Sequence, residues 1–175
     1  MMKKFIKYLI GAIFITTACF LATRTYQSIK TKNEINEKIK TLQHCCFKTL
    51  NGGQTCVDEF DSKKTTVIIY FHPECEHCQY EASEIGKQAE QFAKANMILI
   101  TPDDSIKRVK AFAVKYRLEE VDNLTILLDR NSQFKNQFGT SIFPSVFIYG
   151  SDKKLLKVYK GEIKIEAIIN SINHQ

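Results

Sequence analysis

The chain has 175 residues, of which 44% are hydrophobic, and a formal net charge of +6. That share of hydrophobic residues is enough for a packed core, which excludes disorder for the chain as a whole. Lysines of the later part alternate with acidic residues, and no basic stripe is interleaved with aromatic residues. Nucleic acid is therefore not an expected partner.

Residues 1–23 have the pattern of a segment that directs export. Residues 1–7 are positively charged, and residues 8–22 carry no charge and are mostly apolar. Three interpretations stay open: an uncleaved single-pass anchor in the bacterial cytoplasmic (inner) membrane, a lipoprotein signal acylated at Cys19, and a cleaved secretory signal. Each places the following domain in the periplasm or at the exterior, because the positive residues stay in the cytoplasm.

The next segment, residues 24–43, is polar and contains neither Gly nor Pro. Ile35, Ile39 and Leu42 recur at helical spacing, which predicts a helical stalk. Residues 44–175 then form one folded domain, which is long enough for a core of its own.

Within the domain, strands and helices are predicted to alternate. A hairpin is expected around Asn51-Gly52-Gly53. The other predicted elements are a buried strand over 65–71, a helix over 76–95, a strand over 97–101, a helix from 102–105 to 116, a strand over 124–128, a helix over 131–138, strands over 146–149 and 155–159, and a helix over 162–172. This order predicts an α/β fold with a mixed sheet.

The motif Cys75-Glu76-His77-Cys78 lies where the first buried strand gives way to a helix. Disulfide exchange needs a thiolate, and the unpaired N–H groups and dipole at a helix N-terminus favour an anion there. A thiol in such a site has a lowered pKa. Cys75 is thus the expected nucleophile, and Cys78, one helical turn later, is the expected resolving thiol.

The two residues inside the motif are expected to modulate the thiol pKa in opposite directions. His77 as a cation favours the Cys75 thiolate, whereas the Glu76 carboxylate disfavours it. One residue of each sign leaves the direction of electron flow open.

Two other interpretations of the motif carry less support. A zinc site could recruit His72 or His77, but no second Cys-x-x-Cys follows, so no bound metal is expected. A purely structural disulfide across four residues would constrain little chain. The chemistry expected of the dithiol needs no cofactor, and no glycine-rich phosphate loop follows any strand.

The strand before Cys75, the Cys-x-x-Cys motif and a later Phe143-Pro144 together resemble the thioredoxin-like superfamily. The resemblance covers residues 46–173 and is strongest to the TlpA/ResA-like, membrane-anchored thiol–disulfide oxidoreductases with an AhpC/TSA-redoxin type domain. It implies a thioredoxin-like fold: a central mixed sheet flanked by helices, with an N-terminal hairpin and an inserted αβ unit.

The resemblance also implies roles for three residues. Pro144 would be a cis proline beside the dithiol, and Phe143 would offer its backbone to a substrate strand. Glu81, three residues after Cys78, would modulate thiol protonation. The chain departs from the family pattern where Glu74 replaces the usual tryptophan and His77 replaces a proline, which again leaves the direction of electron flow open.

The expected function is thiol–disulfide exchange with exported proteins, whose thiols or disulfides are the substrates, supported by a membrane redox donor or acceptor protein. Two alternatives are a peroxiredoxin-type thiol peroxidase and a copper or metal chaperone on the same fold. The first lacks the Pro-x-x-x-Thr-x-x-Cys pattern, since Pro73 lies only two residues before Cys75. The second lacks a suitable distant histidine other than His174.

Three further cysteines precede the motif. Either Cys45 or Cys46 could bridge to Cys56 across the predicted hairpin, or all three could be small buried residues. The sequence does not decide between these arrangements.

Overall fold

The computed structural model describes residues 2–173, without the side chains of residues 2–5, 7–9 and 12. His174, weighed above as a metal ligand, lies outside the described residues. The chain divides into a unit of residues 1–37 and a body of residues 38–175. Residues 2–37 of the first unit belong to one helix, α1 (Met2–Lys38). No helix in the described part of the chain has the length and hydrophobicity needed to cross a membrane.

The predicted stalk helix through residue 43 is wrong at its end. Helix α1 stops at Lys38, and Ile39 and Leu42 are buried in the body as non-helical chain. The Leu42 N–H donates to the carbonyl of Lys153 at 2.8 Å. Burial and this hydrogen bond replace the helical continuation, so the body begins before the predicted boundary at residue 44.

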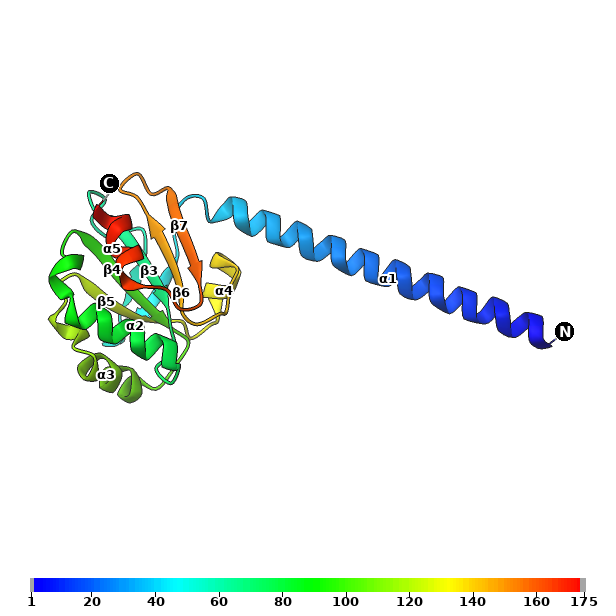
Figure 1. The fold of residues 1–175 in the computed structure, drawn as a ribbon, viewed down its shortest axis with the longest axis horizontal. Helices are drawn as coiled ribbons and strands as arrows, with labels where there is room; N and C mark the ends of the chain where they lie inside the picture. The colour runs from blue at the N-terminus through cyan, green and yellow to red at the C-terminus, as the bar shows by residue number, and fades with distance from the viewer. Residues whose placement is uncertain (1, 174–175) are drawn as a thin grey trace. The chain divides into compact units, whose positions relative to one another are not determined.

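The body is built on one seven-stranded mixed sheet, which confirms the predicted α/β class (Figure 1). The strand order is β2-β1-β5-β4-β3-β6-β7. Strands β3, β4 and β5 are parallel, and the other pairs are antiparallel. The strands are β1 (Cys46–Thr49), β2 (Gln54–Cys56), β3 (Thr65–Tyr70), β4 (Ala95–Thr101), β5 (Leu124–Leu128), β6 (Ser145–Tyr149) and β7 (Leu155–Lys160).

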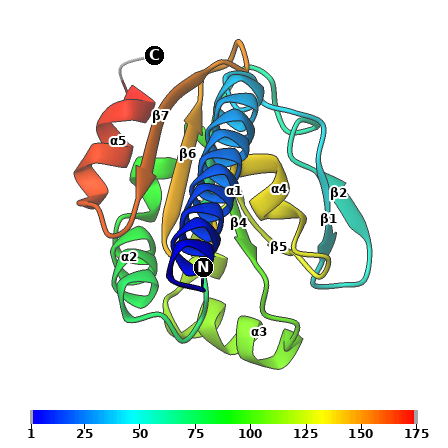
Figure 2. The same cartoon turned by 90° about the vertical axis from the view of Figure 1, so that its right-hand side faces the viewer.

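Helices cover both faces of the sheet, as Figures 1 and 2 show for α2, α5 and α4. The helices of the body are α2 (Glu76–Lys87), α3 (Ile106–Lys115), α4 (Gln133–Phe138) and α5 (Ile165–Asn173). Val67 and Ile69 of β3 join the core under α2, α3 and α5. On the other face, the ring of Tyr70 stacks on Phe134 of α4 at 4.0 Å. All six residues of β3 are buried, as expected for a central strand.

The helix predicted over 76–95 is present but is wrong at its end. Helix α2 ends at Lys87, a 3₁₀ turn spans Ala89–Phe92, and β4 begins at Ala95. Phe92 is fully buried, so packing of the 3₁₀ turn replaces the last helical turns. Apolar periodicity continued past the end of the helix, which is why the sequence did not reveal this boundary.

Gly86 lets α2 pack closely on the chain that follows α3. A Cβ atom built on Gly86 would lie 2.0 Å from the carbonyl oxygen of Tyr116. We expect Gly86→Ala to lower the free energy of unfolding by about 2 kcal/mol, although alanine is the better helix former. Urea unfolding monitored by circular dichroism measures this, with Ser83→Ala on the same helix as control. An unchanged midpoint would contradict the close approach.

The hairpin predicted around Gly52 is present as β1 and β2, with Gly52 at φ 87°. Cys46 and Cys56 face each other in the register and form a disulfide. Cys45 has a free thiol and is buried, and burial, followed by the nearby Asp129 charge, raises the pKa of that thiol to about 12. The bridge therefore uses Cys46, and Cys45 is the small buried residue.

Candidate active site

Cys75 is the N-cap residue of α2, with extended backbone geometry. Its N–H donates to the carbonyl of His72 at 3.0 Å, and its carbonyl accepts from Gln79 N–H at 2.9 Å. The thiol is free and partly exposed. The sulfur thus lies at the N-terminus of a helix, where an anion is favoured and where a partner can reach it.

Cys78 lies one turn into α2 and is buried, with a free thiol. Burial raises the pKa of the Cys78 thiol far above its ordinary value. A backbone hydrogen bond from His72 opposes this, while Cys75 and Glu81 raise the pKa further. The structure therefore places an accessible sulfur beside a buried sulfur whose pKa is raised.

Glu81 is the most unusual group near the dithiol. Its side chain is 2% exposed, and neither carboxyl oxygen has a hydrogen-bond partner among the described residues. Burial, followed by the charge of Glu162, raises the pKa of Glu81 to about 8. A carboxyl group with such a pKa can give and take a proton near neutral pH.

The Phe143–Pro144 peptide is cis, as the family resemblance implied. The Cys75 thiol lies 3.9 Å from the Phe143 carbonyl oxygen and can donate to it. Pro144 lines a small apolar cavity of about 10 Å³ together with Cys78 and Glu81. A segment 65 to 69 residues further along the chain is thus brought against the dithiol by the pairing of β6 with β3.

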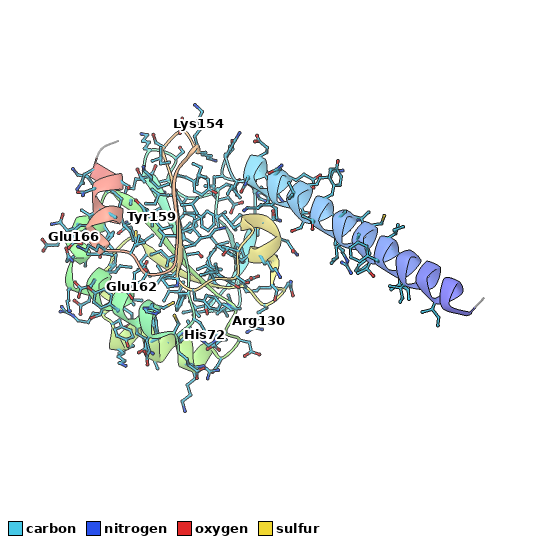
Figure 3. All side chains as sticks on the ribbon, turned by 45° about the vertical axis from the view of Figure 1, so that its right-hand side comes forward. His72, Arg130, Lys154, Tyr159, Glu162 and Glu166 are labelled. Atoms are coloured by element: carbon cyan, nitrogen blue, oxygen red, sulfur yellow. A yellow bond between two sulfur atoms is a disulfide. The ribbon has the colours of Figure 1, made fainter. Side chains whose placement is uncertain are left out.

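His77 is exposed and contacts the carboxylate of Glu162. Figure 3 shows Glu162 on the loop that leads from β7 into α5. Glu162 therefore contacts His77 on one side and raises the pKa of Glu81 on the other. Glu76 lies exposed in the first turn of α2.

Glu74, at the position where the family resemblance implied a tryptophan, is held by Arg108 of α3. The Arg108 Nη1 donates to Glu74 Oε1 at 2.8 Å, and its Nε donates to Asp103 Oδ2 at 2.6 Å. Ion pairs with Arg108 thus hold the residue that precedes Cys75, in place of the packing of an aromatic ring.

The dithiol is not part of a metal-ligand cluster among the described residues. Within them, one group of three potential ligands lies close together, made of His44, Cys46 and Cys56. The two sulfurs of that group are joined in a disulfide and are therefore not thiolate ligands in this state. His72 accepts from the Glu74 N–H at 3.3 Å, and His77 contacts Glu162.

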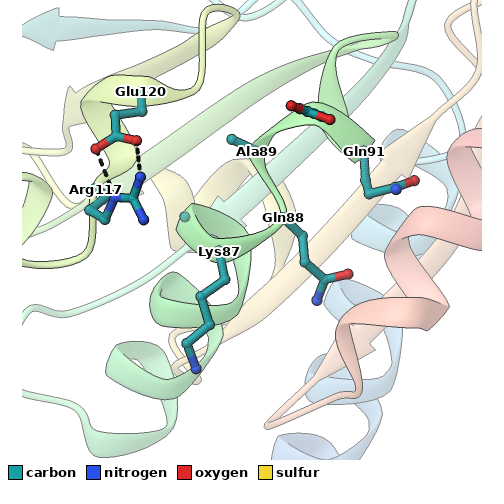
Figure 4. Close-up of a pocket in the computed structure, with 8 residues that line it drawn as sticks. Lys87, Gln88, Ala89, Gln91, Arg117 and Glu120 are labelled. Atoms are coloured by element: carbon teal, nitrogen blue, oxygen red, sulfur yellow. Dashed lines mark hydrogen bonds and ion pairs between the residues drawn. The ribbon is translucent and has the colours of Figure 1, made fainter.

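A larger pocket, of about 400 Å³, lies at the opposite end of α2 (Figure 4). Its walls include Lys87, Gln88 and the ion pair of Arg117 with Glu120. None of the residues assigned above to disulfide exchange lines it, and it contains no cysteine or histidine.

A sequence profile of the AhpC/TSA family matches residues 36–158, which is most of the chain. The chain belongs to the AhpC/TSA family. The sequence-based recognition of a redoxin-type domain is therefore confirmed. None of the curated protein sequences compared with the chain matches it significantly.

Solved structures show the same fold at low sequence identity. A secreted Mycobacterium tuberculosis disulfide oxidoreductase homologous to E. coli DsbE is 17% identical with a TM-score of 0.65, covering 79% of this chain and 98% of its own. A thiol-disulfide oxidoreductase of Bacteroides fragilis is 13% identical with a TM-score of 0.63, covering 77% and 98%. Peroxidoxin BcpB of M. tuberculosis is 18% identical with a TM-score of 0.64, covering 77% and 94%. The fold is thus that of the thioredoxin-like oxidoreductases.

The structure brings together five of the residues selected from sequence and adds three others. Cys75, Cys78, Glu81 and the Phe143-Pro144 loop meet at one end of the sheet. The three are Arg108, Glu162 and His72, which the sequence suggested only as a metal ligand. No motif in the sequence distinguishes Arg108 and Glu162 from the other charged residues, and only the fold shows what they contact.

The electrostatic role of Glu162 can be tested directly. We expect Glu162→Gln to lower the pKa of Glu81, because the substitution removes a neighbouring negative charge. NMR titration of the Glu81 carboxyl carbon measures the change. Glu166→Gln, an exposed residue of α5, is the matched control. An unchanged Glu81 titration in Glu162→Gln would show that burial alone sets it.

Proposed function

We propose that the chain exchanges disulfides with thiols of exported proteins through Cys75 and Cys78. The observation that carries the proposal is the asymmetry of the two sulfurs at the start of α2. Cys75 is accessible at the helix N-cap, and Cys78 is buried with a raised pKa. A partner therefore meets Cys75 first, and Cys78 resolves the mixed disulfide from inside.

Glu81 and the Phe143-Pro144 loop serve the same exchange in this proposal. Glu81 takes the proton that Cys78 must lose before it attacks, since its pKa of about 8 suits proton transfer near neutral pH. The Phe143 carbonyl, 3.9 Å from the Cys75 sulfur, lies where the backbone of a bound substrate would be held.

The proposed site of action is outside the cytoplasm. The positive residues 1–7 followed by the uncharged residues 8–22 support this, because the pattern directs the body across the bacterial inner membrane. A membrane redox protein is then the proposed electron donor or acceptor. Fractionation of cells that express the full chain tests the location; recovery only in the cytoplasm would overturn it.

The activity test is disulfide reduction by the full chain. With dithiothreitol as reductant, we expect the protein to accelerate the reduction of insulin, measured by precipitation of the freed B chain. A rate equal to that of dithiothreitol alone would overturn the proposal. The reduction potential of the Cys75–Cys78 pair, from equilibrium with glutathione, then decides whether the protein donates or withdraws electrons.

A thiol peroxidase is the second candidate. Membership of the AhpC/TSA family and the similarity to a peroxidoxin structure favour it. Such an enzyme would use Cys75 to attack hydrogen peroxide and Cys78 to resolve the sulfenic acid. Peroxide consumption coupled to thiol oxidation separates the two candidates.

A further inference from the structure

A second group of reactive side chains lies on the β1–β2 hairpin, away from the Cys75–Cys78 pair. It consists of the Cys46–Cys56 disulfide, His44 and Asp58. Because β5 and β4 separate β1 from β3 in the sheet, about 14 Å of strand spacing separates the hairpin from the strand that leads into Cys75. The two groups do not share residues.

The disulfide spans a position where the two strands approach each other closely. The Val57 N–H donates to the Cys45 carbonyl at 2.9 Å, which makes these two a hydrogen-bonded pair. Cys46 and Cys56, the next pair in the register, form a non-hydrogen-bonded pair with Cα atoms 3.8 Å apart. Side chains of such a pair face each other directly, and the pairing of β1 with β2 sets Cys46 opposite Cys56 independently of the bond between them.

An imidazole is aligned on this disulfide. His44 Nε2 lies 3.4 Å from Cys46 Sγ, and His44 Nδ1 lies 3.0 and 3.2 Å from the two carboxylate oxygens of Asp58. A carboxylate accepts hydrogen bonds only, so Asp58 holds the proton on Nδ1 and leaves the Nε2 lone pair facing the sulfur. A sulfur, a base and a group that orients the base are thus in line, and reduction of the disulfide turns that sulfur into a thiol.

Exposure distinguishes the two sulfurs. Cys46 is partly exposed beside the exposed His44, whereas Cys56 is 8% exposed. A partner can therefore reach Cys46 directly, and Cys56 is the sulfur that resolves. A disulfide that only fastened the hairpin would require neither the histidine nor the carboxylate behind it.

We infer that Cys46–Cys56 is a second disulfide-exchange site, with His44 as its catalytic base and Asp58 as the positioning residue. In the reduced state, His44 Nε2 takes the proton of the Cys46 thiol, and the thiolate attacks a partner disulfide. The first partner sulfur leaves and takes this proton. Cys56 then attacks Cys46 in the mixed disulfide, and the second partner sulfur leaves with the Cys56 proton. Two electrons pass from the cysteine pair to the partner, and the reverse reaction oxidises a partner dithiol.

This inference goes beyond the proposed function and is tested separately from it. The full chain with Cys75→Ser and Cys78→Ser is reduced, and oxidised glutathione is added as the partner disulfide. We expect Cys46–Cys56 to re-form, and His44→Ala in this background to slow the reaction about tenfold at pH 7. Lys48→Ala, an exposed residue of β1, is the matched control and should leave the rate unchanged.

Alkylation followed by mass spectrometry measures the fraction of the chain in which the Cys46–Cys56 disulfide has re-formed. Circular dichroism shows that the fold is retained. Resistance of the Cys46–Cys56 bond to dithiothreitol until the chain unfolds would overturn the inference. So would an equal rate in His44→Ala and the Lys48→Ala control.

The positioning role of Asp58 is tested by a separate measurement. We expect Asp58→Ala to remove the preference for the Nδ1–H tautomer of His44, seen in the ¹⁵N chemical shifts of its ring, and to slow the oxidation. An unchanged tautomer would show that Asp58 does not position the imidazole.

Discussion

Replacement of Cys75 by serine is expected to lower the rate of insulin disulfide reduction at least about 1,000-fold. The Cys75 sulfur is the accessible one at the N-cap of α2, and Cys78 is buried with a strongly raised pKa. Cys78 therefore cannot act as the attacking thiol in its place. The measurement is the precipitation rate of insulin with dithiothreitol, compared with that of the wild-type chain.

The matched variant is Cys78→Ser, which keeps the attacking sulfur and removes the resolving one. We expect it to accumulate mixed disulfides with substrate, visible as bands that disappear on reduction. If Cys75→Ser traps substrate and Cys78→Ser does not, the two roles are reversed. If Cys75→Ser keeps the wild-type rate, the exchange does not pass through this pair.

Glu81→Gln is expected to stabilise the protein at alkaline pH. Glu81 has its pKa raised to about 8 by burial and by the charge of Glu162, against an ordinary value of 4.5. Between these values the folded state holds a proton that the unfolded state has released, so the free energy of unfolding falls as the pH rises. The loss is on the order of 4 kcal/mol by pH 9, since each pKa unit is worth about 1.4 kcal/mol.

The glutamine variant lacks this titration. Its free energy of unfolding should therefore exceed that of the wild-type chain only slightly at pH 5 and by about 4 kcal/mol at pH 9. Urea unfolding at both pH values measures it. Glu84→Gln, on the same helix and ion-paired with Lys87, is the control and should retain the wild-type pH dependence. A difference independent of pH would show that Glu81 does not titrate between these limits.

The gain in stability should have a cost in activity. Because glutamine cannot accept the proton of Cys78, we expect the resolving step of Glu81→Gln to slow about 100-fold at pH 7. Decay of a preformed mixed disulfide on Cys75 measures this step alone. An unchanged decay rate would assign the proton of Cys78 to another group.

Much of the local structure followed from residue types. The uncharged β-branched and aromatic run before Cys75 predicted the buried strand β3, and Gly139 predicted the end of α4, where it has φ 70°. Ser105 caps α3 by accepting from Arg108 N–H at 3.4 Å, as expected of a serine before an apolar helical pattern. These features depend on neighbours within a few residues, which a sequence displays directly.

The ends of helices were predicted less well from the sequence. The periodic apolar pattern over 76–95 predicted one helix, but burial of Phe92 in a 3₁₀ turn and the contact of Gly86 with Tyr116 decide where α2 ends. Likewise, Ile39 fitted a helical stalk by spacing but lies in the core of the body. Packing partners distant in the chain determined both outcomes, and periodicity carries no information about them.

The sequence by itself determined the pair of sulfurs at a strand-to-helix junction, because Cys-x-x-Cys spacing and the helix N-terminus are local properties. The tertiary structure alone decided that Cys46 rather than Cys45 bonds to Cys56, that Glu81 is buried without a partner, and that Glu162 meets His77. Strand register and burial set these three, and both arise from contacts between separate segments, 10 residues apart for Cys46 and Cys56 and 85 residues apart for His77 and Glu162.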